Sequence, residues 1–102
     1  MDFPNVEFVK FPEMDEVDQG LLVKALEHFM NKVPYMKDVK LHLSLKDYAR
    51  GGLRSQHELH GTLMVDGKKY FASETNWKLL EVIQDVLKKL EKEVQKEHEK
   101  KA

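Results

Sequence analysis

The chain has 102 residues, enough for one domain with a single hydrophobic core and too few for two domains of ordinary size. It contains no cysteine, which excludes disulfides, thiolate metal sites and cysteine nucleophiles. Its 17 basic and 18 acidic residues leave a net charge of -1, whereas nucleic-acid-binding domains are usually strongly basic.

The sequence shows no recognisable targeting signal and no common enzyme motif. The first ten residues have neither the basic segment nor the apolar core of a signal peptide, and no apolar run approaches the roughly 18 residues of a membrane span. We therefore expect a cytoplasmic protein without a membrane partner. Phosphate-binding, dinucleotide-binding, metalloprotease and serine-hydrolase motifs are missing. We expect no enzyme, no cofactor and no small-molecule substrate.

The first part of the chain predicts a strand and a helix. Residues 6–11 form a short apolar strand that Pro12 ends. Apolar residues then recur at steps of three and four over residues 17–33, which predicts an amphipathic helix facing a core. Asp15 or Asp18 is expected to cap the start of this helix.

Three strands are predicted next. Residues 39–45 alternate apolar and polar side chains, as a half-buried strand does. Strands over 57–65 and 68–73 flank the hairpin signal Asp66-Gly67. Residues 47–56 are expected to form a loop. One side of these strands is predicted to face solvent, with the side chains of Lys40, His42, Ser44, Glu58, His60, Thr62, Met64 and Phe71.

The last predicted element is a long helix that begins at about residue 76. Its apolar stripe stops at Val94, and residues 95–102 are expected to fray. The element order β-α-β-β-β-α predicts an α+β fold. We expect one domain over residues 1–102, with a four-stranded, mostly antiparallel sheet and two helices packed on one face.

The distribution of charge is more informative than its sum. Residues 1–37 hold four lysines against seven acids, a net of -3. Lys89, Lys92 and Lys96 are spaced three and four apart, so they share one helix face and are able to follow a phosphate backbone. The alternative is a solvated face stabilised by acid–lysine pairs, such as Asp85 with Lys89.

Histidines on the predicted strands suggest a metal site. His42 and His60 lie on the exposed face, and His57 is near them in the sequence. Zinc requires three or four ligands in tetrahedral geometry, and the sequence places no third ligand beside the two exposed histidines. We therefore expect no metal ion.

The second half of the chain resembles a known family. It reads Thr62-Leu63-x-Val65-x-Gly67, then Ala72-Ser73, then a helix with Ile83-Gln84, Val86, Lys89-Leu90, Lys92-Glu93-Val94 and Lys96. This pattern resembles the ribosome hibernation-promoting factor family, also called ribosome-associated inhibitor or sigma-54 modulation protein. The β-α-β-β-β-α order is similar too, and the resemblance covers residues 6–98. The sequence departs from the family pattern at two helix positions, Gln84 and Glu93.

The resemblance implies a non-enzymatic stress-response protein that binds the small ribosomal subunit through its rRNA. Such a protein blocks translation, or protects idle ribosomes, by occupying the channel of messenger and transfer RNA. The sequence stops after the last helix, so it resembles the short form of the family. By matched position, the resemblance implies RNA contacts through Lys32, Lys89, Lys92 and Lys96.

The predicted loop contains two arginines. Arg50 and Arg54 flank Gly51-Gly52 in the predicted loop, and we expect them to reach phosphates.

The alternative function is a protein-interaction module of the same fold with weak or no RNA binding. It is suggested by the acidic first third of the chain and by the exposed Phe71 and Met64.

Overall fold

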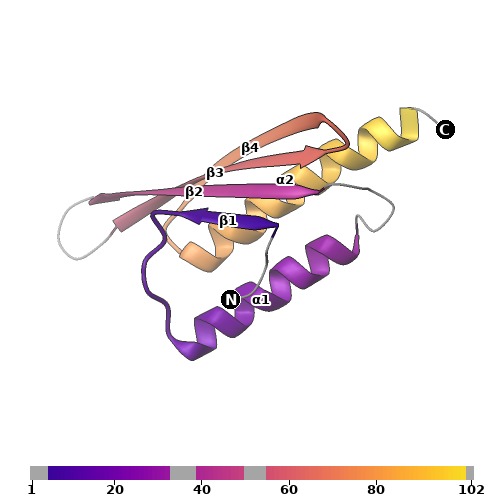
Figure 1. Cartoon of the computed structure of the whole chain (residues 1–102). Coiled ribbons are helices and arrows are strands. Elements are labelled where there is room, and N and C mark those ends of the chain that lie inside the picture. Colours follow the sequence, from indigo (N-terminus) through magenta and orange to yellow (C-terminus); the bar gives the residue numbers. More distant parts are fainter. Residues whose placement is uncertain (1–4, 33–38, 50–54, 101–102) are drawn as a thin grey trace.

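A four-stranded sheet with both helices on one side forms the framework of the protein (Figure 1). The computed structural model describes residues 5–32, 39–49 and 55–100. Along the chain these residues form β1 (Val6–Val9), α1 (Glu16–Asn31), β2 (Lys40–Ala49), β3 (Ser55–Val65), β4 (Lys68–Asn76) and α2 (Leu79–Lys100). The predicted α+β class and element order are confirmed.

The strands are ordered β1-β2-β3-β4 across the sheet. β2, β3 and β4 form an antiparallel meander, whereas β1 runs parallel to β2, with Val6 opposite Leu41. A parallel neighbour requires a crossover, and α1 supplies it. The hairpin between β3 and β4 turns at Asp66 and Gly67, whose φ angles of 50° and 83° suit the tight turn that favours Asp-Gly.

Local capping and an apolar stripe explain α1. The carboxylate of Asp15 accepts a hydrogen bond of 2.8 Å from the backbone N–H of Asp18, as the sequence predicts for an N-cap. Acidic residues in the first turn also suit the positive end of the helix dipole. The helix lies beside α2 (Figure 1) and buries Leu22, Leu26 and Phe29.

The core lies between α2 and the inner face of the sheet. α2 buries one apolar side in the arrangement that its sequence periodicity predicts. Gly61 of β3 lies directly under this helix, in close contact with Val86 and Leu90. The described residues include no buried polar or charged side chain. The helix contributes Val82, Ile83, Val86, Leu87, Leu90 and Val94 to the core, opposite Leu41, Leu43, Leu45, Leu59, Leu63 and Val65.

Several element boundaries differ from the predictions. β1 ends at Val9, because Lys10 has a φ of 62° that leaves the extended region. β2 and β3 pair further than expected, out to Ala49 opposite Ser55, so much of the predicted loop over 47–56 is strand. α2 begins at Leu79 and not at about 76, because Asn76 still belongs to β4.

The end of α2 contacts the sheet. The helix extends to Lys100, and fraying of its last residues stays a prediction. Tyr70 of β4 donates a hydrogen bond of 2.7 Å to Glu97, and Lys68 forms an ion pair with the same carboxylate. These contacts fasten the last turns of the helix to the start of β4.

Candidate nucleic-acid interface

Four described lysines lie on the exposed side of α2, at positions 88, 89, 92 and 96, and carboxylates form ion pairs with two of them. Lys89 forms an ion pair with Glu74 of β4, so it points toward the edge of the sheet. Lys96 lies 3.9 Å from Glu93, one turn earlier on the same helix. Asp85, the partner that the sequence suggested for Lys89, is not the partner observed. The acid–lysine alternative is therefore partly realised, with different pairs.

Lys32 lies on the other flank of α2. It follows the last turn of α1, and its Nζ atom is 3.3 Å from Glu91 Oε1. Glu91 is two residues after Lys89, about 200° around the helix at 3.6 residues per turn. The structure therefore places Lys32 and Lys89 on opposite sides of α2.

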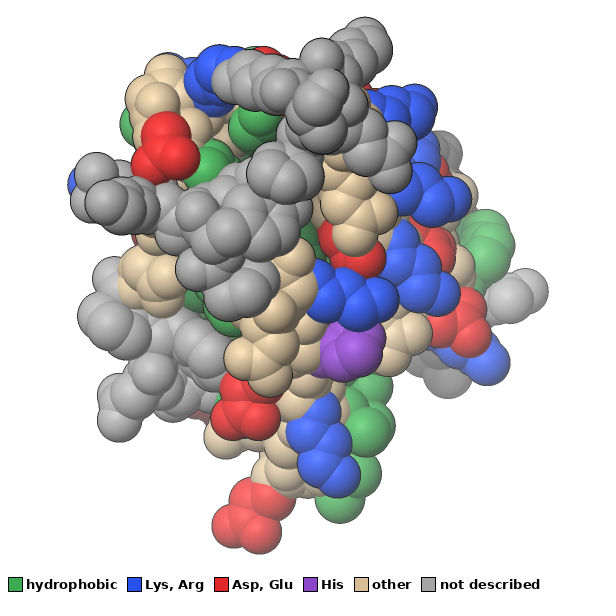
Figure 2. Space-filling view, turned by 90° about the vertical axis from the view of Figure 1, so that its right-hand side faces the viewer, with side chains coloured by type: hydrophobic (Ala, Val, Ile, Leu, Met, Phe, Trp, Pro, Cys, Tyr) green, Lys and Arg blue, Asp and Glu red, His purple; other side chains and the backbone are tan. Residues whose placement is uncertain are grey.

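The exposed ridge of α2 connects these two flanks. Lys88 and Lys92 are exposed there, and neither forms an ion pair with a residue that the structure describes. Figure 2 shows the face on the right-hand side of Figure 1, where lysine side chains are interspersed with carboxylates. Exposed ion pairs contribute at most about 1 kcal/mol, so a phosphate is able to displace the carboxylates. Arg50 and Arg54 lie outside the described residues.

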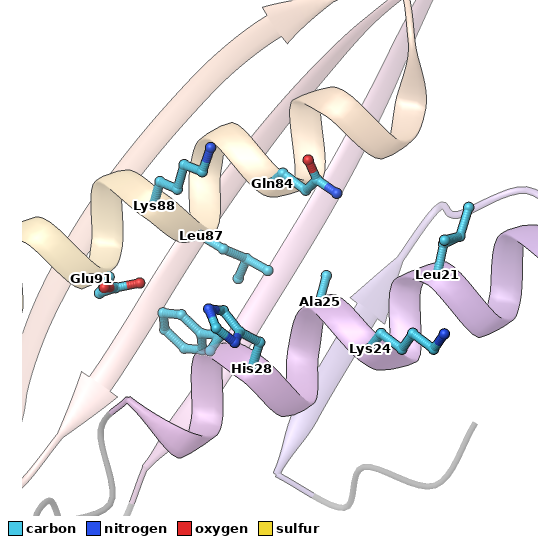
Figure 3. Close-up of a pocket in the computed structure, with 9 residues that line it drawn as sticks. Leu21, Lys24, Ala25, His28, Gln84, Leu87, Lys88 and Glu91 are labelled. Atoms are coloured by element: carbon cyan, nitrogen blue, oxygen red, sulfur yellow. The ribbon is translucent and has the colours of Figure 1, made fainter.

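A groove between the two helices was not predicted from the sequence. It has a volume of about 390 Å³, with Leu21, Ala25 and Leu87 on its apolar side and Lys24 and Lys88 at its rims (Figure 3). Leu21 is 45% exposed. The apolar stripe of α1 is wider than the surface that α2 covers, so part of the stripe stays exposed. Which of its residues is exposed depends on the packing angle of the two helices.

The three histidines on the strands pair with carboxylates. His42 Nδ1 is 3.1 Å from Glu7, His60 Nε2 is 2.6 Å from Glu58, and His57 is similarly paired with Asp47. In residues 5–32, 39–49 and 55–100, no group of three or more potential metal ligands is present. Within the same ranges, no helix has the length and apolar character that crossing a membrane requires.

Together, the mixed sheet, the β-α-β-β-β-α order and the lysine-bearing last helix define a class of small α+β domain. Fifteen chains of known structure match this protein. One is the crystal structure of the N-terminal domain of Thermus thermophilus Protein Y, with a TM-score of 0.58, 14% sequence identity, and coverage of 89% of this chain and 93% of that chain. This likeness establishes the fold. No protein-family model matches the sequence, and no curated protein sequence matches it.

Proposed function

We propose that this protein is a cytoplasmic ribosome-binding hibernation factor that binds the small subunit through rRNA. The observation that carries the proposal is the fold, which is similar to the Protein Y domain over nearly the whole of both chains. Protein Y belongs to the ribosome hibernation-promoting factor family. The sequence of α2 resembles that family on separate grounds, because its matched positions include Lys89, Lys92 and Lys96 as well as core residues.

The exposed ridge of α2 is the proposed contact with RNA. Lys88 and Lys92 are available to phosphates directly, whereas Lys89, Lys96 and Lys32 must exchange a carboxylate for a phosphate. Such contacts position a protein on RNA without reading bases. The domain would act by occupying the ribosomal channel, without chemistry. Because the contacts with RNA are made between lysines and phosphates, we expect binding to weaken as the salt concentration rises.

Charge reversal on the ridge tests the proposal. Lys89→Glu combined with Lys92→Glu is expected to remove the protein from the small-subunit fractions of a sucrose gradient. The matched control, Lys10→Glu with Lys46→Glu, makes the same change of charge at exposed lysines that belong neither to the ridge nor to the helix groove. Both double variants should melt close to the wild type, since each exposed ion pair contributes at most about 1 kcal/mol.

Two results would contradict the proposal. One is absence of the wild-type protein from ribosomal fractions at low salt. The other is equal loss of binding in the ridge variant and its control, because the position of the lysines would then have no influence.

The helix groove favours one alternative, a protein-interaction module of the same fold. Its apolar side chains include the half-exposed Leu21, which a partner protein would cover. A partner captured equally well after nuclease treatment and at high salt, and lost with Leu21→Glu, supports this alternative. Loss of ribosome binding above about 0.2 M salt supports RNA instead.

A further inference from the structure

The side of the sheet that bears no helix carries an ordered arrangement of side chains. We call it the open face. The strand register places Lys40, Met64 and Lys69 in one row across β2, β3 and β4. The next row contains His42, Thr62 and Phe71, and the third contains Ser44, His60 and Ser73. Adjacent rows lie about 7 Å apart along the strands.

Phe71 is the most unusual member of this face. It is 68% exposed and lies in the middle of β4, the edge strand, so it stands at the end of the second row. It lines a hollow of about 320 Å³ together with Thr62, His60 and Ser73. An aromatic ring next to hydroxyl and imidazole groups offers a stacking surface for a nucleobase, with hydrogen-bonding partners at its edge.

Two lysines belong to the first row, next to the row that contains Phe71. Lys40 and Lys69 stand on either side of Met64, about 10 Å apart across two strand spacings. They line a second hollow, of about 460 Å³, that shares Thr62 with the first. Within the described part of the chain neither lysine forms an ion pair. An anionic group is therefore able to bind between them, one row away from a base stacked on Phe71.

We propose that the open face binds single-stranded RNA, with a base on Phe71 and a phosphate between Lys40 and Lys69. The large exposed apolar side chains on this face do not form one patch, because Met64 and Phe71 lie in neighbouring rows and Tyr48 lies three rows away from Phe71 along β2. They do not make the contiguous core of a protein interface. The carboxylates on this face are already paired, Glu7 with His42 and Glu58 with His60.

Hydroxyl groups favour RNA over DNA. Ser44, Thr62 and Ser73 lie beside the proposed strand, where their side chains are able to exchange hydrogen bonds with ribose 2′-hydroxyls. This inference goes beyond the proposed ribosomal function, because the open face lies on the side of the sheet opposite α2. The domain would then bind structured RNA with its helix and an unpaired strand with its sheet.

Fluorescence anisotropy with a labelled oligouridylate of about ten nucleotides tests the proposal. Phe71→Ala should weaken binding about 5- to 150-fold, the loss expected for one stacked base, whereas Phe71→Trp should retain binding. Lys69→Gln should weaken binding and reduce the slope of log affinity against log salt by about 0.7. Its matched control is Lys24→Gln on α1, which should change neither quantity.

Four results would overturn the proposal. They are no binding of oligouridylate at low salt, wild-type affinity of Phe71→Ala, equal effects of Lys69→Gln and Lys24→Gln, and equal affinity for an oligothymidylate. Phe71 is exposed, so its variants should fold, and a thermal melt checks this. The test is separate from that of the ribosomal function, because Lys89→Glu with Lys92→Glu should still bind oligouridylate.

Discussion

The sheet and α2 approach closely at Gly61, and its replacement by alanine tests the packing of the core. A Cβ atom at this position would lie 2.6 Å from Val86 Cγ1, 3.2 Å from Leu90 Cδ1 and 3.4 Å from Leu43 Cδ2. Carbon atoms in ordinary contact are about 3.5–4.0 Å apart. Gly61→Ala therefore forces α2 away from β3, or forces Val86 out of its rotamer.

Two opposing contributions decide whether Gly61→Ala raises or lowers the free energy of unfolding. In a strand, alanine is otherwise better than glycine by about 0.5–1 kcal/mol, because glycine loses more conformational entropy on folding. Overpacking of a core costs about 1–3 kcal/mol. We expect Gly61→Ala to lower the free energy of unfolding by about 1–2 kcal/mol, with a fall in melting temperature of about 4–8 °C for each kcal/mol.

Urea denaturation of four proteins measures this effect: the wild type, Gly61→Ala, Val86→Ala and the double variant. Val86→Ala removes the atom in closest contact, so the double variant should be more stable than the sum of the single effects predicts, by about 0.5–3 kcal/mol. A stabilised Gly61→Ala, or strictly additive effects, would show that the helix does not lie this close to the strand.

Two further predictions concern the ends of the helices. Burial, and then the hydrogen bond to Glu97, raise the pKa of Tyr70, so the phenol stabilises the fold while it is protonated. Tyr70→Phe should lower the free energy of unfolding by about 1 kcal/mol below pH 10, because the hydrogen bond is lost. The difference from the wild type should shrink as the pH rises above about 10, because the phenol of the wild type then ionises. Urea denaturation from about pH 8 to 11 measures this, and a difference that grows with pH would contradict it. Asp15→Ala should cost about 1 kcal/mol by removing the cap of α1, and Asp15→Ser should recover most of it in the same assay.

Periodicity was sufficient to predict the elements and the two sides of the sheet. The alternation in residues 39–45 and 57–65 determines which side chains enter the core, and the exposure of Met64 and Phe71 is confirmed. These features follow from local geometry, because side chains alternate along a strand whatever its neighbours are. The class of the fold followed from the order of the elements.

The pairs between distant residues could not be predicted in this way. Lys89 has Asp85 one turn away in sequence, but its partner is Glu74 on another element. Glu97 holds the end of α2 through contacts with Tyr70 and Lys68, residues nearly thirty positions earlier. Such pairs depend on the angle at which the helix crosses β4, which the periodicity of a single element does not contain. The groove beside Leu21 has the same origin.

The parallel pairing of β1 has a consequence for the dynamics of the molecule. β2, β3, β4 and α2 follow one another in the chain and pack as successive neighbours, whereas β1 pairs with residues 35 positions away. α1 packs beside α2 and buries only Leu22, Leu26 and Phe29. Release of β1 and α1 therefore breaks fewer contacts than opening of the meander, and their amide hydrogens should exchange with solvent sooner. The helix that carries the lysine ridge belongs to the part that opens last.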